Sequence, residues 1–177
     1  MNRKIADLME AMIAYDKGDV RRIQHFLKVH DLAVTIGTLE GLPENELFIL
    51  EAAAILHDIG IHKSEEKYHS SAGKYQEIEG PGEAEKLLAN LGGFTTGQIN
   101  RIKYLIAHHH TYGNIQEQDY QILVEADFLV NLYEDGSSKE TVTKVLQNIF
   151  RTEAGIRLLK AMEQRRAYDR DCEPYGF

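Results

Sequence analysis

The apolar residues of this chain recur mainly at intervals of three and four positions, which is the spacing of an amphipathic helix. Residues 4–15 show this pattern first, and we predict a helix there. Residues 16–19 (DKGD) break the pattern and offer an N-cap for a second helix over about residues 20–39. A third helix is predicted over about residues 44–57, after a break that contains a glycine and a proline.

The longest loop is expected over residues 60–86, which are polar and rich in Gly, Ser and Lys. Loops of this length in compact domains are often functional, so this segment is a candidate functional loop. A helix restarts within residues 82–92, where the sequence is GEAEKLLANLG. Another helix is predicted over residues 95–110, which end in three consecutive histidines.

Residues 118–136 are apolar on most faces of a helix, so we expect them near the centre of the fold. Their Ile, Leu and Val content would also allow a buried strand, but the length of the segment and the Glu-Ala-Asp sequence at residues 125–127 favour a helix. Two closing segments, about residues 138–151 and 152–170, have amphipathic patterns. No repeat or linker divides the chain, so the pattern predicts a single all-α domain over residues 1–177, a compact helical bundle.

Composition and charge narrow the classes of partner. Hydrophobic residues make up 43% and charged residues 27%, as in ordinary globular proteins. No apolar run approaches the ~20 residues that cross a bilayer, and the N-terminal segment lacks the pattern of a signal peptide, so no membrane partner is expected. The net charge of −8 disfavours duplex DNA or RNA, because binding to phosphate backbones needs a basic surface. A small phosphorylated ligand stays compatible with this charge if metal ions supply local positive charge.

The single cysteine, Cys172, lies in a polar tail (AYDRDCEPYGF). It excludes a disulfide within the chain and makes a cysteine-based zinc site unexpected. We expect an exposed thiol in a reducing cytoplasm, and a tail that is disordered, as is usual for a terminus. The oligomeric state is left open by the sequence.

The eight histidines are unevenly placed, and one of them belongs to a polar pair that ends an apolar helix. His57 and Asp58 follow the run AAAIL and precede a helix stop at Gly60. Neighbours on a helix point about 100° apart, so both reach one ion only if it lies off the helix end. His25 lies near the apolar side of the second predicted helix, where an ordinary core histidine is the alternative. Asp127 is an acid in a strongly apolar helix, and it needs a cation, a hydrogen-bond network or a raised pKa. A buried Arg partner is the ordinary explanation.

Together these residues offer two imidazoles and two carboxylates, which suit a divalent ion such as Mn, Fe, Co, Ni, Zn or Mg. Helices of a bundle can bring such ligands together in its core. The order His25, His57-Asp58, Asp127 resembles the signature of the HD-domain superfamily of metal-dependent phosphohydrolases. The surrounding sequences RRIQHFLKVHDLA, EAAAILHDIG and ILVEADFLVNL are similar to its three ligand-bearing helices. The resemblance implies an HD-type helical bundle in which these four residues bind one divalent metal.

The resemblance covers about residues 20–135, which makes residues 136–177 a C-terminal helical extension. Members with two metals take further ligands from a His or His-His at the end of a later helix, and LIAHHHTYG is similar to that element. Counting one turn on from Ile106 favours His109, and then His110, as a ligand of a second metal or a contact to substrate. A solvated helix end is the alternative for these histidines.

The chain departs from the family pattern in two places. Many members have a Lys directly after the HDIG stretch, whereas here Ile61 follows and Lys63 comes two residues later. Where two-metal members carry a His before the next helix, the nearest match is Glu79. Either Glu79 replaces that His as an oxygen ligand or the second metal is missing. His69 is another candidate, but its surroundings, KYHSSAGKY, favour a mobile loop.

The resemblance also implies an enzyme that hydrolyses a phosphoester or phosphoanhydride of a small molecule, with a nucleotide as the expected substrate. A bound metal would activate water, Asp58 would orient or deprotonate that water, and His109 would stabilise the transferred phosphoryl group. Basic residues bordering the expected site are candidates for binding the substrate phosphate. These are Arg22, Lys28 and Lys63, within a wider group that also contains Arg21, Lys67 and Lys74.

Two alternatives stay open. Some members of the superfamily use a di-iron pair for oxygen-dependent cleavage, which the His cluster permits, although Glu79 in place of an imidazole weakens this reading. A non-catalytic nucleotide-sensing domain is the other alternative. The presence of all four core ligands argues against it without proving turnover.

Overall fold

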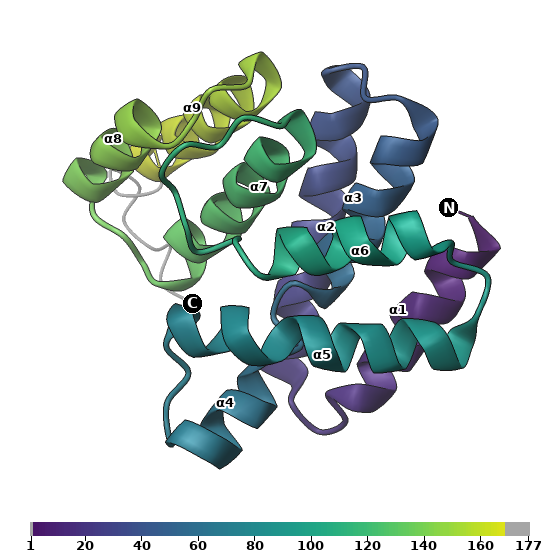
Figure 1. The fold of residues 1–177 in the computed structure, drawn as a ribbon. Helices are drawn as coiled ribbons and strands as arrows, with labels where there is room; N and C mark the ends of the chain where they lie inside the picture. The colour runs from purple at the N-terminus through teal and green to yellow at the C-terminus, as the bar shows by residue number, and fades with distance from the viewer. Residues whose placement is uncertain (1, 169–177) are drawn as a thin grey trace, which may run out of the picture.

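The structure, a computed structural model, describes the backbone of residues 2–168 and the side chains of residues 2–163 (Figure 1). Every regular element in this part of the chain is a helix, and it contains no strand, so the predicted all-α fold is confirmed. The helices are α1 (Arg3–Tyr15), α2 (Val20–Leu39), α3 (Glu44–Leu56), α4 (Ile61–Tyr68), α5 (Gly73–Leu91), α6 (Thr96–Ile106), α7 (Gln118–Glu134), α8 (Lys139–Asn148) and α9 (Glu153–Tyr168).

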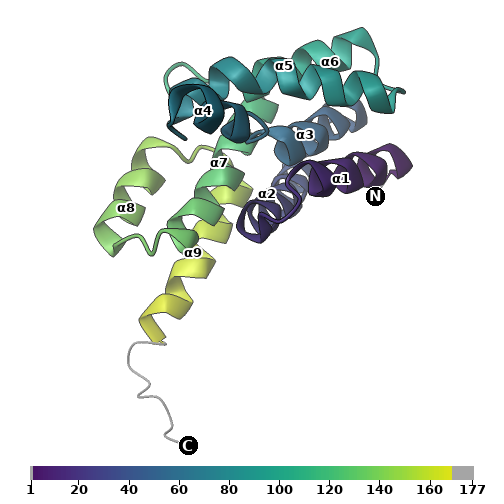
Figure 2. The ribbon, with the colours of Figure 1, turned by 90° about the horizontal axis from the view of Figure 1, so that it is seen from below.

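Helices α2, α3 and α7 form the centre of the fold, because α2 packs against both α3 and α7, and α7 also contacts α3. Helices α5 and α6 run side by side and, with the short α4, cover one side of this centre (Figures 1 and 2). Helix α1 packs against α3 and α5, and α9 packs against α7. The expected central position of residues 118–136 is confirmed, since Ile122, Leu123, Val124 and Ala126 are fully buried.

Side-chain caps begin helices where the polar breaks predicted them. Asp19 Oδ1 accepts a hydrogen bond from the backbone N–H of Arg22 at 3.1 Å, so the DKGD segment does cap α2. Thr95 and Gln98 form a reciprocal capping box at the start of α6. Such caps satisfy backbone donors that the first helical turn leaves without partners.

The predicted loop over residues 60–86 is wrong, because α4 and most of α5 occupy this segment. The segment has few apolar residues and contains several glycines and Pro81, all of which disfavour a helix considered in isolation. Tertiary packing overrides that preference. A Cβ atom on Gly60 would lie 2.7 Å from the backbone nitrogen of Gly80, so the start of α4 approaches α5 this closely only because residue 60 is a glycine.

The helix predicted over residues 95–110 ends earlier, at Ile106, and residues 108–110 lie in the turn that follows. The tail expected to be disordered is residues 167–177, of which residues 167 and 168 end α9. Residues 169–177, with Cys172 and its expected exposed thiol, lie outside the described part of the chain.

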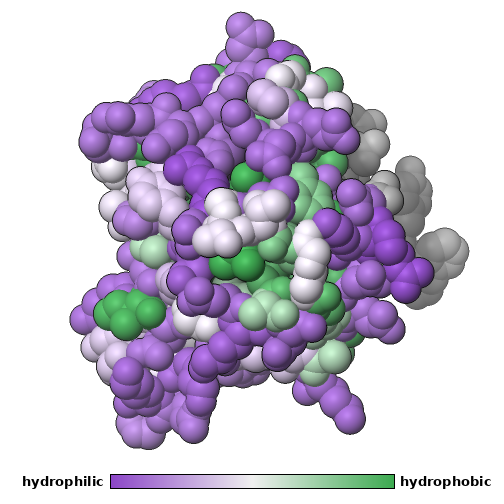
Figure 3. Space-filling view, turned by 45° about the vertical axis from the view of Figure 1, so that its right-hand side comes forward, coloured by the Kyte–Doolittle hydropathy of each residue, from purple (hydrophilic) through white to green (hydrophobic). Residues whose placement is uncertain are grey.

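The face of the molecule in Figure 3 is largely hydrophilic, with apolar side chains mainly in a central area and a few elsewhere. Among the helices described, none combines the length and the apolar character that a bilayer crossing requires.

Candidate metal centre

Four side chains expected to bind metal converge where α2, the end of α3 and α7 meet. His25 Nε2 lies 3.3 Å from His57 Nε2 and 3.2 Å from Asp127 Oδ1. Asp58 Oδ2 lies 3.7 Å from His25 Nε2 and 3.5 Å from His57 Nε2. His25, His57 and Asp127 are buried, while Asp58 is partly exposed. The packing of α2 against α3 and α7 therefore brings together ligands that are far apart in the sequence.

Hydrogen bonds set which ring nitrogen of each histidine faces the cluster. His57 Nδ1 lies 2.8 Å from the carbonyl oxygen of Ala54, and His25 Nδ1 lies 3.1 Å from Glu134 Oε2. Both partners only accept hydrogen bonds, so each Nδ1 carries the proton and donates it. The Nε2 atoms point into the cluster, and each becomes a metal ligand when it gives up its proton on metal binding.

The electrostatics of the cluster favour a cation. Burial alone would lower the pKa of His57, but the carboxylates of Asp58 and Asp127 outweigh this effect and raise the pKa to about 9. Burial opposes ionisation of Asp127, yet hydrogen bonds with His25 and His57 hold its pKa below the usual range. Two ionised carboxylates in a largely buried site need a compensating positive charge, which a divalent ion supplies.

The donor set fits a divalent metal. Ligand atoms of His25, His57 and Asp58 all lie within 4.8 Å of one another, so one ion can contact all three. Asp127 is outside this group of three, but its Oδ1 lies 3.2 Å from His25 Nε2 and 3.6 Å from His57 Nε2, and Asn131 Nδ2 donates to it at 2.8 Å. Imidazole nitrogens with carboxylate oxygens suit the ions from Mn to Zn, and such supported carboxylates are typical of metal sites.

A second group of potential ligands adjoins the first. Ligand atoms of Asp58, His109 and His110 also lie within 4.8 Å of one another. His109 is fully buried, and its Nδ1 donates to the carbonyl oxygen of Ile106 at 2.7 Å. Its Nε2 lies 3.5 Å from Asp58 Oδ1 and is the one buried side-chain N or O atom without a hydrogen-bond partner in the described residues. A lone pair buried in this way is suited to a second ion or to a polar group of the substrate.

The other two candidates for a second metal lie elsewhere. Glu79 Oε1 accepts hydrogen bonds from Lys67 at 2.8 Å and from Tyr68 at 2.7 Å, and it belongs to neither ligand group. His69 is exposed at the C-terminus of α4, with a left-handed backbone (φ 53°). Glu79 thus has two donors on α4 to satisfy its charge.

Gln76 was missed in the sequence, where it has no distinguishing pattern. It is buried on α5, and its side-chain N–H donates to the carbonyl oxygen of Ser71 at 2.6 Å. This bond leaves Gln76 Oε1 to accept from His110 Nε2 at 3.0 Å. The proton of His110 is therefore on Nε2, and its Nδ1 has the lone pair.

A cavity of about 490 Å³ opens beside the cluster and is lined by His25, Asp58 and Gln76. Among the basic residues expected to border the site, Arg21 and Arg22 line this cavity. Three acceptors hold Arg22 in place: Asp19, His62 and Glu65.

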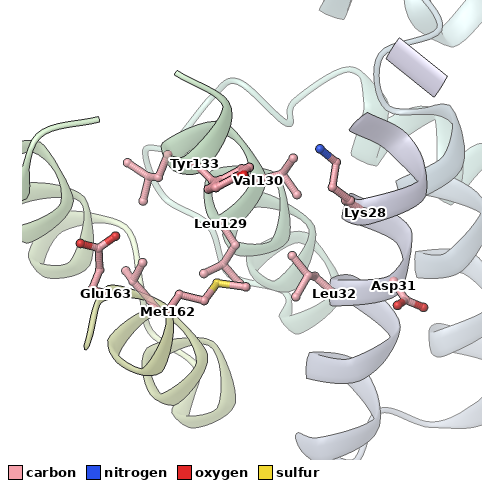
Figure 4. Close-up of a pocket in the computed structure, with 10 residues that line it drawn as sticks. Lys28, Asp31, Leu32, Leu129, Val130, Tyr133, Met162 and Glu163 are labelled. Carbon is pink, nitrogen blue, oxygen red and sulfur yellow. The ribbon is translucent and has the colours of Figure 1, made fainter. Parts of the chain in front are cut away.

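The remaining basic candidates are turned to other partners. Lys28 forms an ion pair with Glu134, and Lys63 forms one with Glu66 at 2.7 Å. Lys28 also borders a separate, mostly apolar groove of about 480 Å³ between α2, α7 and α9 (Figure 4). None of the expected metal ligands lines that groove.

Comparison with known families matches residues 22–149 to the HD domain. The match spans most of the chain and all four expected ligands, so the protein belongs to the HD domain family, as the sequence predicted. The arrangement of the His and Asp side chains is compatible with the divalent metal site of that family. No curated protein and no solved structure matches the chain.

Proposed function

We propose that this protein is a metal-dependent phosphohydrolase that cleaves a phosphoester or phosphoanhydride of a small molecule, with nucleotides as the first substrate class to test. Membership of the HD domain family supports the reaction type. The observation that carries the proposal is the buried convergence of two imidazole Nε2 atoms with the carboxylates of Asp58 and Asp127.

In this proposal His25, His57, Asp58 and Asp127 hold one divalent ion. When bound, such an ion lowers the pKa of a water molecule and polarises a phosphoryl oxygen. Asp58 orients the attacking water and accepts its proton, because its partly exposed carboxylate faces the cavity from within the ligand cluster. His109 contacts the transferred phosphoryl group through its Nε2, or holds a second ion together with Asp58 and His110.

Arg21 and Arg22 are the proposed phosphate-binding residues, because both line the cavity that contains Asp58. Arg22 is already oriented by Asp19, His62 and Glu65, so it pays little conformational entropy when a phosphate binds. Arg guanidinium groups bind phosphate oxygens in a bidentate manner. Four acids, Asp19, Asp58, Glu134 and Asp135, line the same cavity, so phosphate binding there also needs the positive charge of a bound metal. The net charge of −8 favours a small anionic substrate over nucleic acid.

The test begins with elemental analysis of the purified protein, followed by a phosphate-release screen over a nucleotide panel with Mn²⁺, Mg²⁺, Zn²⁺, Co²⁺, Ni²⁺ and Fe²⁺. We expect phosphate release that depends on a divalent ion and is abolished in His57→Ala and Asp127→Ala. Two irons per chain with oxygen consumption and no phosphate release would replace hydrolysis by oxygenase chemistry. Tight nucleotide binding without any product over hours would indicate a sensing domain instead.

A further inference from the structure

Helix α7 carries a polar stripe that begins at the expected metal ligand Asp127. Asp127, Asn131 and Glu134 follow one another at intervals of four and three residues, which aligns them along one face of the helix. Asn131 donates to Asp127, and both Asn131 and Glu134 line the cavity beside the metal centre. The stripe extends the candidate metal centre by about two helical turns beyond its last expected ligand.

Glu134 connects two residues of α2. Its Oε2 lies 3.1 Å from His25 Nδ1, and its Oε1 accepts a hydrogen bond from Lys28 Nζ. The side chains of Glu134 and His25 are only 14% and 10% exposed, so water screens this contact weakly. Lys28 extends from α2 toward α7 (Figure 4) and forms an ion pair with the Glu134 oxygen that does not contact His25. Both oxygens of Glu134 therefore have a defined partner.

We propose that Glu134 is a positioning residue for metal binding: it holds the proton of His25 on Nδ1 and orients the ring so that Nε2 faces the ion, while Lys28 anchors Glu134. Carboxylates that accept the second N–H of a metal-bound histidine are common, and their loss typically weakens metal binding about 10–100-fold. The alternative is a purely structural link between α2 and α7, which would affect folding stability without a specific effect on the metal. The proposal rests on the metal-binding part of the proposed function and does not depend on the reaction.

The chain contains a matched control for this contact. His30, also on α2, contacts Glu51 of α3 through Nε2 at 3.3 Å, and these side chains are 6% and 15% exposed. The two His–Glu pairs thus have similar distances and burial, although His30 uses Nε2 where His25 uses Nδ1. His30 belongs to neither group of potential metal ligands. A general effect of losing a buried His–carboxylate bond should appear in both pairs, whereas an effect on the metal should appear only for Glu134.

The experiment measures Mn²⁺ binding to metal-free protein by equilibrium dialysis for wild type, Glu134→Ala, Glu134→Gln, Lys28→Met and Glu51→Gln. We expect Glu134→Ala to weaken Mn²⁺ binding about tenfold or more. Glu134→Gln should lose less, because its amide oxygen still accepts from Nδ1 of His25, and it provides a second test if the alanine variant does not fold. Lys28→Met should give a smaller loss, and Glu51→Gln should bind as wild type does.

Among variants that fold, two results would overturn the proposal. One is that Glu134→Ala binds Mn²⁺ with wild-type affinity. The other is that Glu51→Gln loses as much Mn²⁺ affinity as Glu134→Ala does. A readout that a structural link would not change is the ring tautomer of His25 in Zn²⁺-loaded protein, measured by ¹⁵N NMR. Wild type should show the proton on Nδ1 with metal on Nε2, and Glu134→Ala should lose this single form.

If Mn²⁺ affinity depends on Glu134 but no phosphate is released, the positioning role stands and the proposed hydrolysis fails. If the wild-type protein releases phosphate but Glu134→Ala keeps wild-type Mn²⁺ affinity, the proposed hydrolysis stands and the positioning role fails.

Discussion

Asp58 faces two different imidazoles with its two oxygen atoms: Oδ2 lies 3.5 Å from His57 Nε2, and Oδ1 lies 3.5 Å from His109 Nε2. One carboxylate thus joins the ligand group of His25 and His57 to the group of His109 and His110. Its partial exposure leaves room for a substrate or water beside it. This placement makes Asp58 the residue on which the proposed metal binding and the proposed chemistry both depend.

Replacing Asp58 by Asn should reduce phosphate release by about 100-fold or more, because the neutral amide binds the ion more weakly and accepts no proton from water. The fold should persist, since Asn has nearly the same shape. Phosphate-release assays and metal analysis of the same preparation measure the effect. Asp31→Asn is the matched control, because Asp31 is an exposed acid on α2. Activity of Asp58→Asn within about twofold of wild type would contradict the assigned role.

The variants His109→Ala and His108→Ala should differ sharply in metal binding or in turnover. His109 is buried with a free Nε2, whereas His108 stacks on Tyr104 with ring centroids 4.2 Å apart and lies outside both ligand groups. We expect His109→Ala to lose either the second equivalent of metal or most of the turnover, with the first equivalent still bound. Metal titration followed by calorimetry, together with steady-state kinetics, separates these effects. Equal behaviour of the two variants would remove His109 from the site.

Metal removal should lower the thermal stability of the protein. An ion that binds only the folded state stabilises it by about 2.7 kcal/mol when its free concentration is 100 times its dissociation constant. Adding Mn²⁺ to chelator-treated protein should therefore raise the Tm in differential scanning fluorimetry. Asp127→Ala should show no such rise, while His108→Ala should respond as wild type does. If divalent ions do not change the Tm of the wild-type protein, this result would contradict the metal site.

The metal-free protein should lose stability as the solution becomes alkaline. The pKa of folded His57, about 9, lies above its unfolded value of about 6.5. Protonated His57 therefore contributes stability that is fully present below about pH 6.5 and is lost as the pH rises through about 9. Asp58 and Asp127, whose pKa values are lowered, contribute stability that is lost only in acid. Urea denaturation of chelator-treated protein at roughly pH 7 and pH 9 measures the decline. His57→Ala should show a smaller decline, and an identical pH dependence would refute this assignment.

Gly155→Ala should destabilise the fold by about 1–3 kcal/mol through crowding alone. A Cβ atom there would lie 2.0 Å from Glu125 Oε2, and Glu125 is a buried carboxylate that accepts from the backbone N–H groups of Arg151 and Thr152. Gly82→Ala on α5 is the control, because a Cβ atom at Gly82 meets nothing within 4 Å. That variant should be neutral or gain about 0.5–1 kcal/mol from higher helix propensity. Urea denaturation gives the free energy of unfolding of the two variants. Equal values would contradict the predicted clash between a Cβ atom at residue 155 and the Glu125 carboxylate.

The residue pattern alone was sufficient for most of the helices, for the central position of α7 and for the order His25, His57-Asp58, Asp127. Each of these depends on local signals: apolar spacing, polar breaks, and ionisable side chains in apolar surroundings, which need compensation wherever the chain places them. The stripe of Asp127, Asn131 and Glu134 was recognised only in the structure, because the partner of Glu134 lies 109 residues away on another helix.

Only the tertiary structure decided what residues 60–86 become and how the site is supported. The helices α4 and α5 form there despite weak propensity, because the backbone at Gly60 packs against that of Gly80. The packing of α5 also places Gln76 within hydrogen-bond distance of His110 and places Glu79 next to its two donors on α4. The sequence by itself determined which ionisable residues need a compensating charge or hydrogen bond. Their apolar neighbours in the chain predict burial, and burial of a charged side chain is costly. Which group compensates each of them depends on contacts between distant segments, and those exist only once the helices have packed.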